Sequence, residues 1–362
     1  MSIVKQKSGE EFSRGHNGEG KFIQLDEKEN AGGSMGEKEV EVLSQYDIDV
    51  RNTKKVRGAV LCDTKQGLYL LKELDCSEKT LSALYEVQQR LQGQGYKNID
   101  ILMKNKEEQL YSRAEDGAKY IVKQWFHGKE SDIHKENDIL KSVDNLARLH
   151  NMLVFEEMPE VRKKEPLKEV FSRHNRELKK IRTFIRGRVC KGEFESLYLS
   201  EFDNVYMRAE SALEKLDEFE CKYRLSSYGN QSAVVHGDYN YHNILMTSCG
   251  IATTNFEHIY QGMQIDDFYY FLRKTMEKNQ WSIHLGHKMI ENYSKEKSIS
   301  KEELLYLGIC LAYPEKFWKA ANSYYRSRKS WIPAKSLEKL QLSIKQMEEK
   351  RLFLQEVIQL KM

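Results

Sequence analysis

Between residues 38 and 126 the apolar positions fall in short runs separated by turn signals, a pattern typical of β-strands. The segment GAVLCDTKQGLYLLKEL contains two such runs around the turn residues 65–67, which predicts a β-hairpin whose second strand ends at Lys72. The next segment, SEKTLSALYEVQQRLQGQGY, has apolar residues at helical spacing and glycines at its end, so a helix is predicted there. Further strands are predicted at IDILMK and on both sides of a turn at residues 115–117.

From residue 127 to residue 362 the spacing of apolar residues becomes mainly helical. NDILKSVDNLARLHNML and the C-terminal SLEKLQLSIKQMEEKRLFLQEVIQL each present one apolar face, and two short strand-like runs interrupt the helices between residues 234 and 260. The pattern predicts an α+β fold with a small β-rich lobe, a hinge at residues 124–128 and a larger helical lobe. Residues 1–37, which are nearly free of aromatic residues, are predicted to form a disordered tail.

Charge and composition argue against several classes of function. The 362 residues carry 58 Lys and Arg against 55 Asp and Glu, and a net charge of +3 gives no general attraction to nucleic acid or to an anionic membrane. No segment supplies the roughly 18 uninterrupted apolar residues of a membrane span, and the N-terminus lacks the apolar run of a secretion signal. Six cysteines without a C-x-x-C pair predict neither a zinc site nor a disulfide framework.

The segment VVHGDYNYHNILM, at residues 234–246, carries the candidate chemistry. Phosphoryl transfer needs a cation near the nucleotide phosphates, metal ligands between those phosphates, and a carboxylate near the attacking hydroxyl. Asp238 and Asn243 would face one cleft as the carboxylate and a metal ligand. Lys72, at the end of its strand, would reach the phosphates, and Glu86 on the following helix would hold Lys72 by an ion pair.

Each of these residues also has a plain structural explanation. A lysine that ends an apolar strand is commonly a surface residue whose stem covers apolar neighbours, and Glu73 and Glu78 compete with Glu86 for Lys72. An isolated HGD is a turn whose Asp caps a helix. The full string His-Gly-Asp-x-x-x-x-Asn fixes four residue types at set spacing beside apolar strands, and it therefore favours the catalytic interpretation.

VVHGDYNYHNIL resembles the catalytic loop of the aminoglycoside phosphotransferase and choline kinase superfamily, a branch of the protein-kinase-like fold. TKQGLYLLK, YIVKQWFHGKE, LARLHN, IDDFYYFLRK and the aromatic stretch YPEKFWKAANSYYRSRKSWIPAKSLEKLQ resemble the CotS/CotI group of spore coat proteins from endospore-forming bacteria. The resemblance extends from about residue 40 to the end of the chain. It implies a two-lobe protein-kinase-like fold, with residues 38–126 as the N-terminal lobe and residues 127–362 as the C-terminal lobe.

The resemblance also implies two cofactors, ATP and Mg²⁺, and roles for individual residues. Asp238 corresponds to the catalytic base, and Asp267 to the aspartate that braces the catalytic loop from a following helix. The remaining positions are the metal ligand Asn243, the phosphate-contacting Lys72, and the adenine-flanking hinge residues Gln124, Trp125 and Phe126.

One position departs from the superfamily pattern. The metal-binding strand end usually reads Asp-Phe-Asp or Asp-Phe-Glu, whereas this chain reads Asn255-Phe256-Glu257. Asparagine keeps one carbonyl oxygen but lacks the charge that Mg²⁺ prefers, and Glu257 either turns its carboxylate toward the metal in compensation or faces solvent. The phosphate-binding loop is also weak, because Gly58 and Gly67 are the only candidate glycines and form no G-x-G-x-x-G string.

Two hypotheses about function stay open at this point. The first is a coat protein of the CotS/CotI type with weak or absent phosphotransferase activity, made in the mother-cell cytoplasm and deposited in the spore coat with other coat proteins. The second is an active ATP- and Mg²⁺-dependent kinase of a small-molecule hydroxyl, with Asn322, Tyr325 and Lys329 in the acceptor site. The basic segment 162–191 either docks an acidic partner or is a solvated helix face, and no nucleic-acid partner is predicted.

Overall fold

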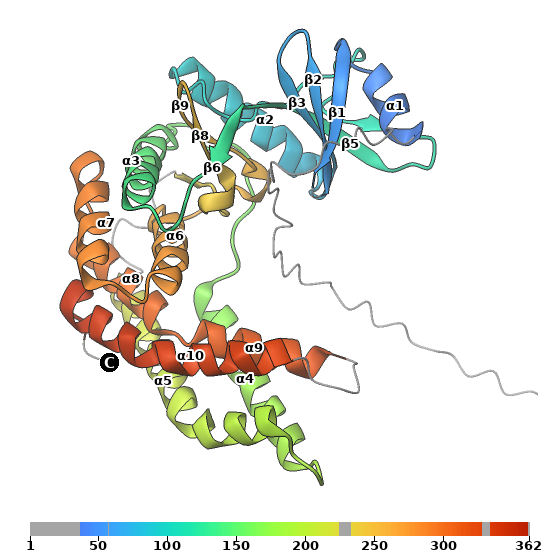
Figure 1. Ribbon diagram of the computed structural model, residues 1–362. Coiled ribbons are helices and arrows are strands. Elements are labelled where there is room, and N and C mark those ends of the chain that lie inside the picture. Colours follow the sequence, from blue (N-terminus) through green and yellow to red (C-terminus); the bar gives the residue numbers. More distant parts are fainter. Residues whose placement is uncertain (1–36, 57, 224–232, 328–333, 361–362) are drawn as a thin grey trace, which may run out of the picture.

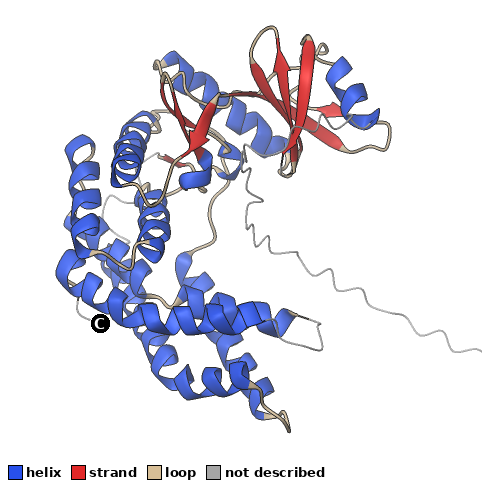
Figure 2. Ribbon diagram, in the orientation of Figure 1, coloured by secondary structure: helices blue, strands red, loops and turns tan. Residues whose placement is uncertain are grey.

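The computed structural model describes residues 37–56, 58–223, 233–327 and 334–360. Within these ranges the chain forms two lobes (Figure 1). Figure 2 shows a sheet of several strands in one lobe, whereas helices make up most of the other. The predicted α+β architecture is confirmed. The predicted tail lies, apart from Glu37, outside the described residues.

A five-stranded antiparallel sheet in the order β1-β2-β3-β5-β4 forms the body of the N-terminal lobe. Helix α2 begins after Ser77, whose side chain accepts from the backbone N–H of Thr80 and caps the helix. The elements of this lobe are α1 (Glu37–Ser44), β1 (Val50–Val56), β2 (Ala59–Thr64), β3 (Leu68–Glu73), α2 (Glu78–Gly93), β4 (Ser112–Arg113) and β5 (Lys119–Trp125).

The β2–β3 hairpin forms where the sequence predicts it. Gly67 at its turn has φ +139°, a conformation that favours glycine. Strand β3 pairs with β5 in a register that places Lys72 opposite Ile121 and Leu70 opposite Lys123. Paired residues of an antiparallel ladder share a face of the sheet, and so do alternate residues along a strand. The register therefore places Lys72 and Lys123 on the same face.

The C-terminal lobe holds residues 234–246, called the catalytic-loop segment because of their resemblance to such a loop, between small strand pairs and a helical body. Strands β6, β8 and β9 form one sheet, and β7 pairs with β10. Its strands and short helical turns are β6 (Gly128–Glu130), β7 (Val234–Val235), η2 (Tyr241–Asn243), β8 (Ile244–Thr247), β9 (Gly250–Thr253), η3 (Phe256–His258) and β10 (Tyr260–Gln261). Its helices are α3 (Glu136–Met152), α4 (Leu167–Arg186), α5 (Glu193–Tyr223), α6 (Ile265–Lys278), α7 (Ile283–Glu296), α8 (Lys301–Ala312), α9 (Glu315–Arg326) and α10 (Ala334–Phe353), with the π-helical turn η4 (Leu354–Ile358). None of the helices in the described ranges is both long and apolar enough to cross a lipid bilayer.

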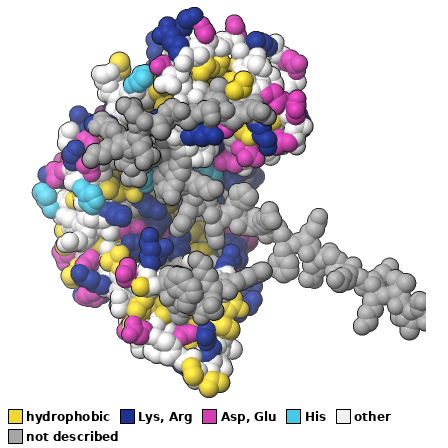
Figure 3. Space-filling model, turned by 45° about the vertical axis from the view of Figure 1, so that its right-hand side comes forward, with side chains coloured by type: hydrophobic (Ala, Val, Ile, Leu, Met, Phe, Trp, Pro, Cys, Tyr) yellow, Lys and Arg dark blue, Asp and Glu magenta, His cyan; other side chains and the backbone are white. Residues whose placement is uncertain are grey.

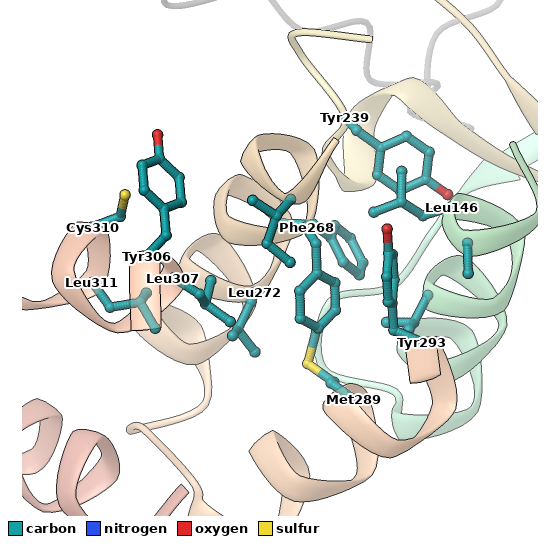
Figure 4. Packing of buried hydrophobic residues seen from close by; sticks show 14 of the residues in the cluster. Leu146, Tyr239, Phe268, Leu272, Met289, Tyr293, Tyr306, Leu307, Cys310 and Leu311 are labelled. Atoms are coloured by element: carbon teal, nitrogen blue, oxygen red, sulfur yellow. The ribbon is translucent and has the colours of Figure 1, made fainter. Parts of the chain in front are cut away.

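A large hydrophobic cluster joins the catalytic-loop segment to the helices around it. Figure 4 shows the ring of Tyr239 beside α3, with Phe268 of α6 and Tyr293 of α7 in the same packed region. Tyr239 is fully buried, and its hydroxyl donates to the carbonyl oxygen of Ser142 at 2.7 Å. Because Tyr239 directly follows Asp238, this packing fixes the position of the candidate catalytic residue.

The predicted strand at IDILMK is wrong, because this segment changes its hydrogen-bonding partner along its length. Ile99 bridges to Thr253 of β9, whereas Leu102 bridges to Lys123 of β5. A segment that divides its backbone bonds between two sheets forms no continuous ladder with either. Asp100 lies between the two bridges, and its side chain is buried.

The basic segment 162–191 consists mainly of helix α4, whose apolar stripe is buried. On its polar side, Arg182 forms an ion pair with Asp203 of α5 at 2.8 Å, and Lys168 forms one with Asp217 of the same helix. Part of the positive charge is therefore neutralised within the chain. These contacts favour a structural helix over a docking surface for an acidic partner.

Packing between α7 and the end of α10 gives a test of the fold. A Cβ at Gly286 would lie 2.2 Å from the ring of Phe353. We expect Gly286→Ala to lower the free energy of unfolding by about 1–3 kcal/mol through overpacking, measured by urea denaturation. Gly93→Ala in α2 is the matched control, because a Cβ there meets nothing within 4 Å, and we expect it to be neutral or slightly stabilising. An equal loss of stability in both variants would contradict this packing.

Candidate active site

Asp238 lies in a turn between β7 and η2. Gly237 has φ +81°, and a Cβ at this position would lie 2.2 Å from the carbonyl oxygen of His258, so the turn requires glycine. His236 is buried, with its Nδ1 accepting from the N–H of Asp238 at 3.2 Å and its Nε2 donating to the carbonyl of Thr254 at 3.1 Å. Burial lowers the pKa of His236, which favours the neutral imidazole and a structural role.

Asp267, near the start of α6, braces this turn. Its Oδ2 accepts from the backbone N–H of His236 at 2.7 Å, and its Oδ1 accepts from that of Gly237 at 2.9 Å. The Nε2 of His150 lies 3.2 Å from the same carboxylate. Burial by itself would raise the pKa of Asp267, but the hydrogen bond and charge of His150 and the backbone hydrogen bond from Gly237 outweigh burial and lower this pKa. The structure thus places Asp267 where the sequence predicts a bracing aspartate.

The Asp238 carboxylate is partly exposed and is held by two side-chain amides. Its Oδ1 accepts from Nδ2 of Asn240 at 3.0 Å, and its Oδ2 accepts from Nδ2 of Asn243 at 2.8 Å. Asn243 thus turns its amide nitrogen, which cannot bind a metal ion, toward the candidate base. The two predicted site residues are in direct contact.

The oxygen of Asn243 is also paired. It accepts from Nδ2 of Asn255 at 2.8 Å, and Oδ1 of Asn255 in turn accepts from the ammonium of Lys123 at 3.0 Å. Asn255 itself has φ +63°, a left-handed conformation that asparagine tolerates better than most residues. Hydrogen bonds therefore run in one direction from Lys123 through Asn255 and Asn243 to Asp238.

The series of hydrogen bonds begins at Lys123, a buried cation whose side chain is 1% exposed. Besides Asn255, its ammonium contacts Oδ2 of Asp100 at 2.6 Å and Oε1 of Glu257 at 2.7 Å. Burial alone would lower the pKa of Lys123, but the charges of Asp100 and Glu257 raise it above the ordinary lysine value. Three donors and three acceptors match, which offsets the desolvation of the charge.

The pKa values of the two carboxylates around Lys123 are shifted in opposite directions. Burial raises the pKa of Asp100 to about 6, with Lys123 acting against this rise. Burial would also raise the pKa of Glu257, but Lys123 and Lys72 outweigh it, and the pKa of Glu257 is lowered. Glu257 is therefore an ionised, buried partner of lysines, and the alternative that it faces solvent is excluded.

The expected ion pair between Lys72 and Glu86 is not formed. The carboxylate of Glu86 accepts instead from Arg90, one turn further along α2. The ammonium of Lys72 lies 3.3 Å from Glu257 and 3.3 Å from Asp75. Arg90 lies four residues after Glu86 on the same helix face, a spacing that favours ion pairs along a helix.

The hinge residues join the two lobes. Gln124 is exposed, and its backbone N–H donates to the carbonyl of Ile101 at 2.8 Å. Trp125 is 6% exposed and packs in a cluster with strand residues of both lobes, against which Phe126 also packs. The ring of Trp125 thus serves the contact between the N-terminal sheet and the β8–β9 pair in this structure.

A cavity of about 1070 Å³ opens beside Asp238. Figure 3 shows Lys and Arg side chains beside a hollow on this side of the molecule. Of the three residues predicted for an acceptor site, Asn322 lines the cavity. Tyr325 packs its ring at 5.3 Å from the ring of Phe184, and Lys329 lies outside the described residues.

The arrangement does not fit a magnesium ion at the predicted metal ligands. The side-chain oxygens of Asn243 and Asn255 already accept hydrogen bonds, and Glu257 Oε1 is paired with two lysines. Mg²⁺ binds oxygen at roughly 2.1 Å. Because the Lys123 ammonium lies 3.0 Å from Asn255 Oδ1, such an ion would lie close to it. At about 4 Å, a divalent and a monovalent cation repel by about 8 kcal/mol at an effective dielectric constant of 20.

The carboxylates of Asp100 and Glu257 each have a second oxygen that lacks a hydrogen-bond donor among the described residues. Asp100 Oδ1 and Glu257 Oε2 are buried and have no hydrogen-bond partner in the part of the chain that the structure describes. Buried oxygens of this kind are places for an ordered water molecule or a cation. They show that the centre retains oxygen ligands even though its charge is balanced by lysines.

The sequence analysis missed Lys123 and Asp100. Lys123 is a lone lysine in the apolar strand YIVKQW, and Asp100 is a lone aspartate in the apolar run IDIL. A charged residue in the middle of a buried segment requires a partner of opposite charge, and this signal was available in the sequence. Neither residue lies near the other or near Asn255 along the chain.

Several solved structures that share this fold are described as phosphotransferases or kinases. An aminoglycoside phosphotransferase from Alicyclobacillus acidocaldarius subsp. acidocaldarius DSM 446 superposes with a TM-score of 0.79 at 19% identity, over 93% of this chain and 98% of that one. The AMP-bound spectinomycin phosphotransferase APH(9)-Ia gives a TM-score of 0.60 at 16% identity, over 85% of this chain and 95% of that one. The amicoumacin kinase hAmiN in complex with AMP-PNP, Ca²⁺ and Ami gives 0.53 at 13% identity, over 87% and 96%. The fold is therefore that of the aminoglycoside phosphotransferases.

The sequence comparison is more specific. Residues 39–357 match the family described as "Spore coat putative kinase YutH", and the chain belongs to this family. The predicted membership of a kinase-like group of spore coat proteins is confirmed. A comparison with curated protein sequences gave no match.

The bracing contacts of Asp267 generate a stability prediction. Asp267→Asn would replace one carboxylate oxygen by an N–H₂ donor opposite a backbone N–H, so we expect a loss of about 3 kcal/mol in the free energy of unfolding. Urea denaturation would measure this loss. Asp47→Asn, at an exposed position, is the control and is expected to change stability by less than about 0.5 kcal/mol. Equal stability of the two variants would show that the brace is unimportant.

Proposed function

We propose that the protein is a spore coat component that uses its kinase-like body in coat assembly, with weak or absent phosphotransferase activity. Membership of the spore coat family supports the location, and the fold supports the kinase-like body. The observation that carries the statement on activity is the hydrogen-bond chain from Lys123 through Asn255 and Asn243. A centre whose ligand oxygens are paired with internal donors is poorly suited to bind Mg²⁺ and nucleotide phosphates together.

The hinge supports the same proposal. An adenine ring would have to lie beside the backbone of residues 124–126, where Trp125 is packed against apolar residues of both lobes. Accepting a nucleotide there requires displacement of part of this contact. Binding energy would then be spent on rearranging the protein, which lowers affinity.

Under this proposal the chain is made in the mother-cell cytoplasm and deposited in the spore coat, where its partners are other coat proteins. The family supplies this context. What the body contributes to the coat is a rigid two-lobe unit, joined by buried ionic contacts and by the apolar cluster at the hinge.

A second candidate function is an active ATP- and Mg²⁺-dependent kinase of a small molecule. The observation in its favour is that Asp238 is held by two amides, follows a braced turn and lines a cavity of about 1070 Å³. In this function Asp238 would orient or deprotonate an acceptor hydroxyl, and Lys72 would contact the nucleotide phosphates. It requires the contacts of Lys123 with Asn255 and Glu257 to rearrange so that metal ligands become available.

Complementation in sporulating cells separates the two functions. We expect the wild-type chain in the extracted coat fraction of purified spores, and we expect Asp238→Asn to be deposited in the same amount and to support the same coat morphology. The substitution keeps the shape of the side chain and removes the candidate base. Absence of the wild-type chain from the coat would contradict the proposal, and a coat defect with a stable Asp238→Asn chain would favour the kinase.

A thermal-shift titration with ATP tests the nucleotide site in vitro. A ligand at about 100 times its Kd adds roughly 2.7 kcal/mol of stability, so an occupied site raises the Tm clearly. For the wild-type chain we expect no rise that depends on Mg²⁺ or Mn²⁺. A metal-dependent rise would support the second candidate.

The variant Asn255→Asp sharpens this titration. If the second candidate is right, the restored charge is worth about 1.5–3 kcal/mol and strengthens metal binding roughly 10- to 150-fold, so phosphate transfer should rise. Asp238→Ala should then abolish that transfer. Unchanged turnover in both variants would rule out the assignment of these residues.

A further inference from the structure

Side-chain oxygens of three residues, which belong to two separate segments of the chain, converge on one point. Asp100 lies on the crossing segment between two sheets, and Asn255 and Glu257 lie at the turn η3. Two carboxylates and one amide oxygen at a common point form the kind of ligand set that a hard divalent cation binds. Here the ammonium of Lys123 occupies that point, at 2.6, 2.7 and 3.0 Å from the three oxygens.

The ammonium also fixes the orientation of the amides beyond it. A lysine ammonium only donates hydrogen bonds, and an ionised carboxylate only accepts them. With Lys123 at one end and Asp238 at the other, both intervening amides must present oxygen toward Lys123 and nitrogen toward Asp238. If Asn255 flipped, its Nδ2 would face the ammonium and the chain would break.

We propose that Lys123 is a built-in cation of this centre, which takes the place of a divalent metal ion and positions the Asp238 carboxylate through Asn255 and Asn243. Lys123 is thus a positioning residue and the residue that excludes the metal. The inference rests on the proposed function, because it gives the physical cause of the weak or absent activity. Its test is a metal-binding measurement, whereas the proposed function is tested by location and phosphate transfer.

The balance of charges around Lys123 supports the proposal. Asp100 and Glu257 bring two negative charges, and Lys123 and Lys72 balance them. Removal of Lys123 leaves one excess negative charge and three oxygens without their donor. The buried oxygens Asp100 Oδ1 and Glu257 Oε2, which have no partner in the described ranges, would join them. This combination is an unfilled cation site.

The test is a titration of the full chain with Mn²⁺. Binding is measured as the loss of the free Mn²⁺ signal in electron paramagnetic resonance. We expect the wild-type chain to bind no Mn²⁺ stoichiometrically. We expect Lys123→Met, which keeps the length of the side chain and removes its charge, to bind one Mn²⁺ at least about tenfold more tightly than any binding by the wild type. Its Tm should rise with Mn²⁺, because the ion replaces the ammonium.

Lys72→Met is the matched control. It removes a lysine that also contacts Glu257, at 3.3 Å, but leaves the ammonium of Lys123 in place. We expect it to bind no more Mn²⁺ than the wild type. Mn²⁺ uptake by Lys72→Met equal to that of Lys123→Met would overturn the proposal, because any loss of positive charge nearby would then suffice.

Two further results would overturn it. One is stoichiometric Mn²⁺ binding by the wild type, which would mean that the unpartnered oxygens hold a metal beside Lys123. The other is a Lys123→Met chain that folds but takes up no metal. If Lys123 only fills space in the core, its replacement lowers the stability of the protein by the same amount with and without Mn²⁺. Folding of Lys123→Met in the presence of Mn²⁺ alone would support the proposal.

A charge-matched variant covers the case in which Lys123→Met does not fold under either condition. Lys123→Met/Glu257→Gln removes one positive and one negative charge, so folding is expected. It retains the Asp100 carboxylate and two amide oxygens, and we expect saturable Mn²⁺ binding that the wild type lacks. No difference from the wild type would overturn the proposal. A wild-type chain that is absent from coats but takes no Mn²⁺ would contradict the proposed function alone.

Discussion

Burial of the Lys123 ammonium imposes a requirement on two distant parts of the chain. Desolvating an ion costs several kcal/mol unless good acceptors replace water. The acceptors are Asp100 on the crossing segment and Asn255 and Glu257 at η3. Since Lys123 belongs to the N-terminal sheet and η3 to the C-terminal lobe, satisfying this one ammonium also ties the lobes together.

The turn that carries Asp238 is fixed from two independent sides. Asp267 holds the backbone of the turn through His236 and Gly237, while the amide chain that starts at Lys123 holds the side chain of Asp238. The first support fixes the backbone of the turn. The second support engages the side-chain oxygens of Asn243 and Asn255 as acceptors of hydrogen bonds from within the protein. The turn that carries Asp238 is therefore held in place while the side-chain oxygens of Asn243 and Asn255 are engaged in hydrogen bonds within the protein.

Features that depend on short-range interactions were predictable. The β2–β3 hairpin follows from its turn residues, and α2 follows from its apolar spacing and the glycines at its end. The errors share a cause in long-range geometry. IDILMK has the composition of a strand but divides its backbone bonds between β5 and β9, and Glu86 finds its partner in Arg90 on its own helix.

The sequence by itself determined the fold class, the family and the residues of the catalytic loop, because a motif of fixed spacing and a hydrophobic pattern act through neighbours along the chain. It also showed that Asn255 stands where an acidic residue is expected. Tertiary structure alone decided which groups meet there. The register of β3 against β5 puts Lys72 and Lys123 on one face, and the crossing segment brings Asp100 to Lys123. Charge pairing acts through space, so positions 100, 123 and 257 reveal their common role only after the chain has folded.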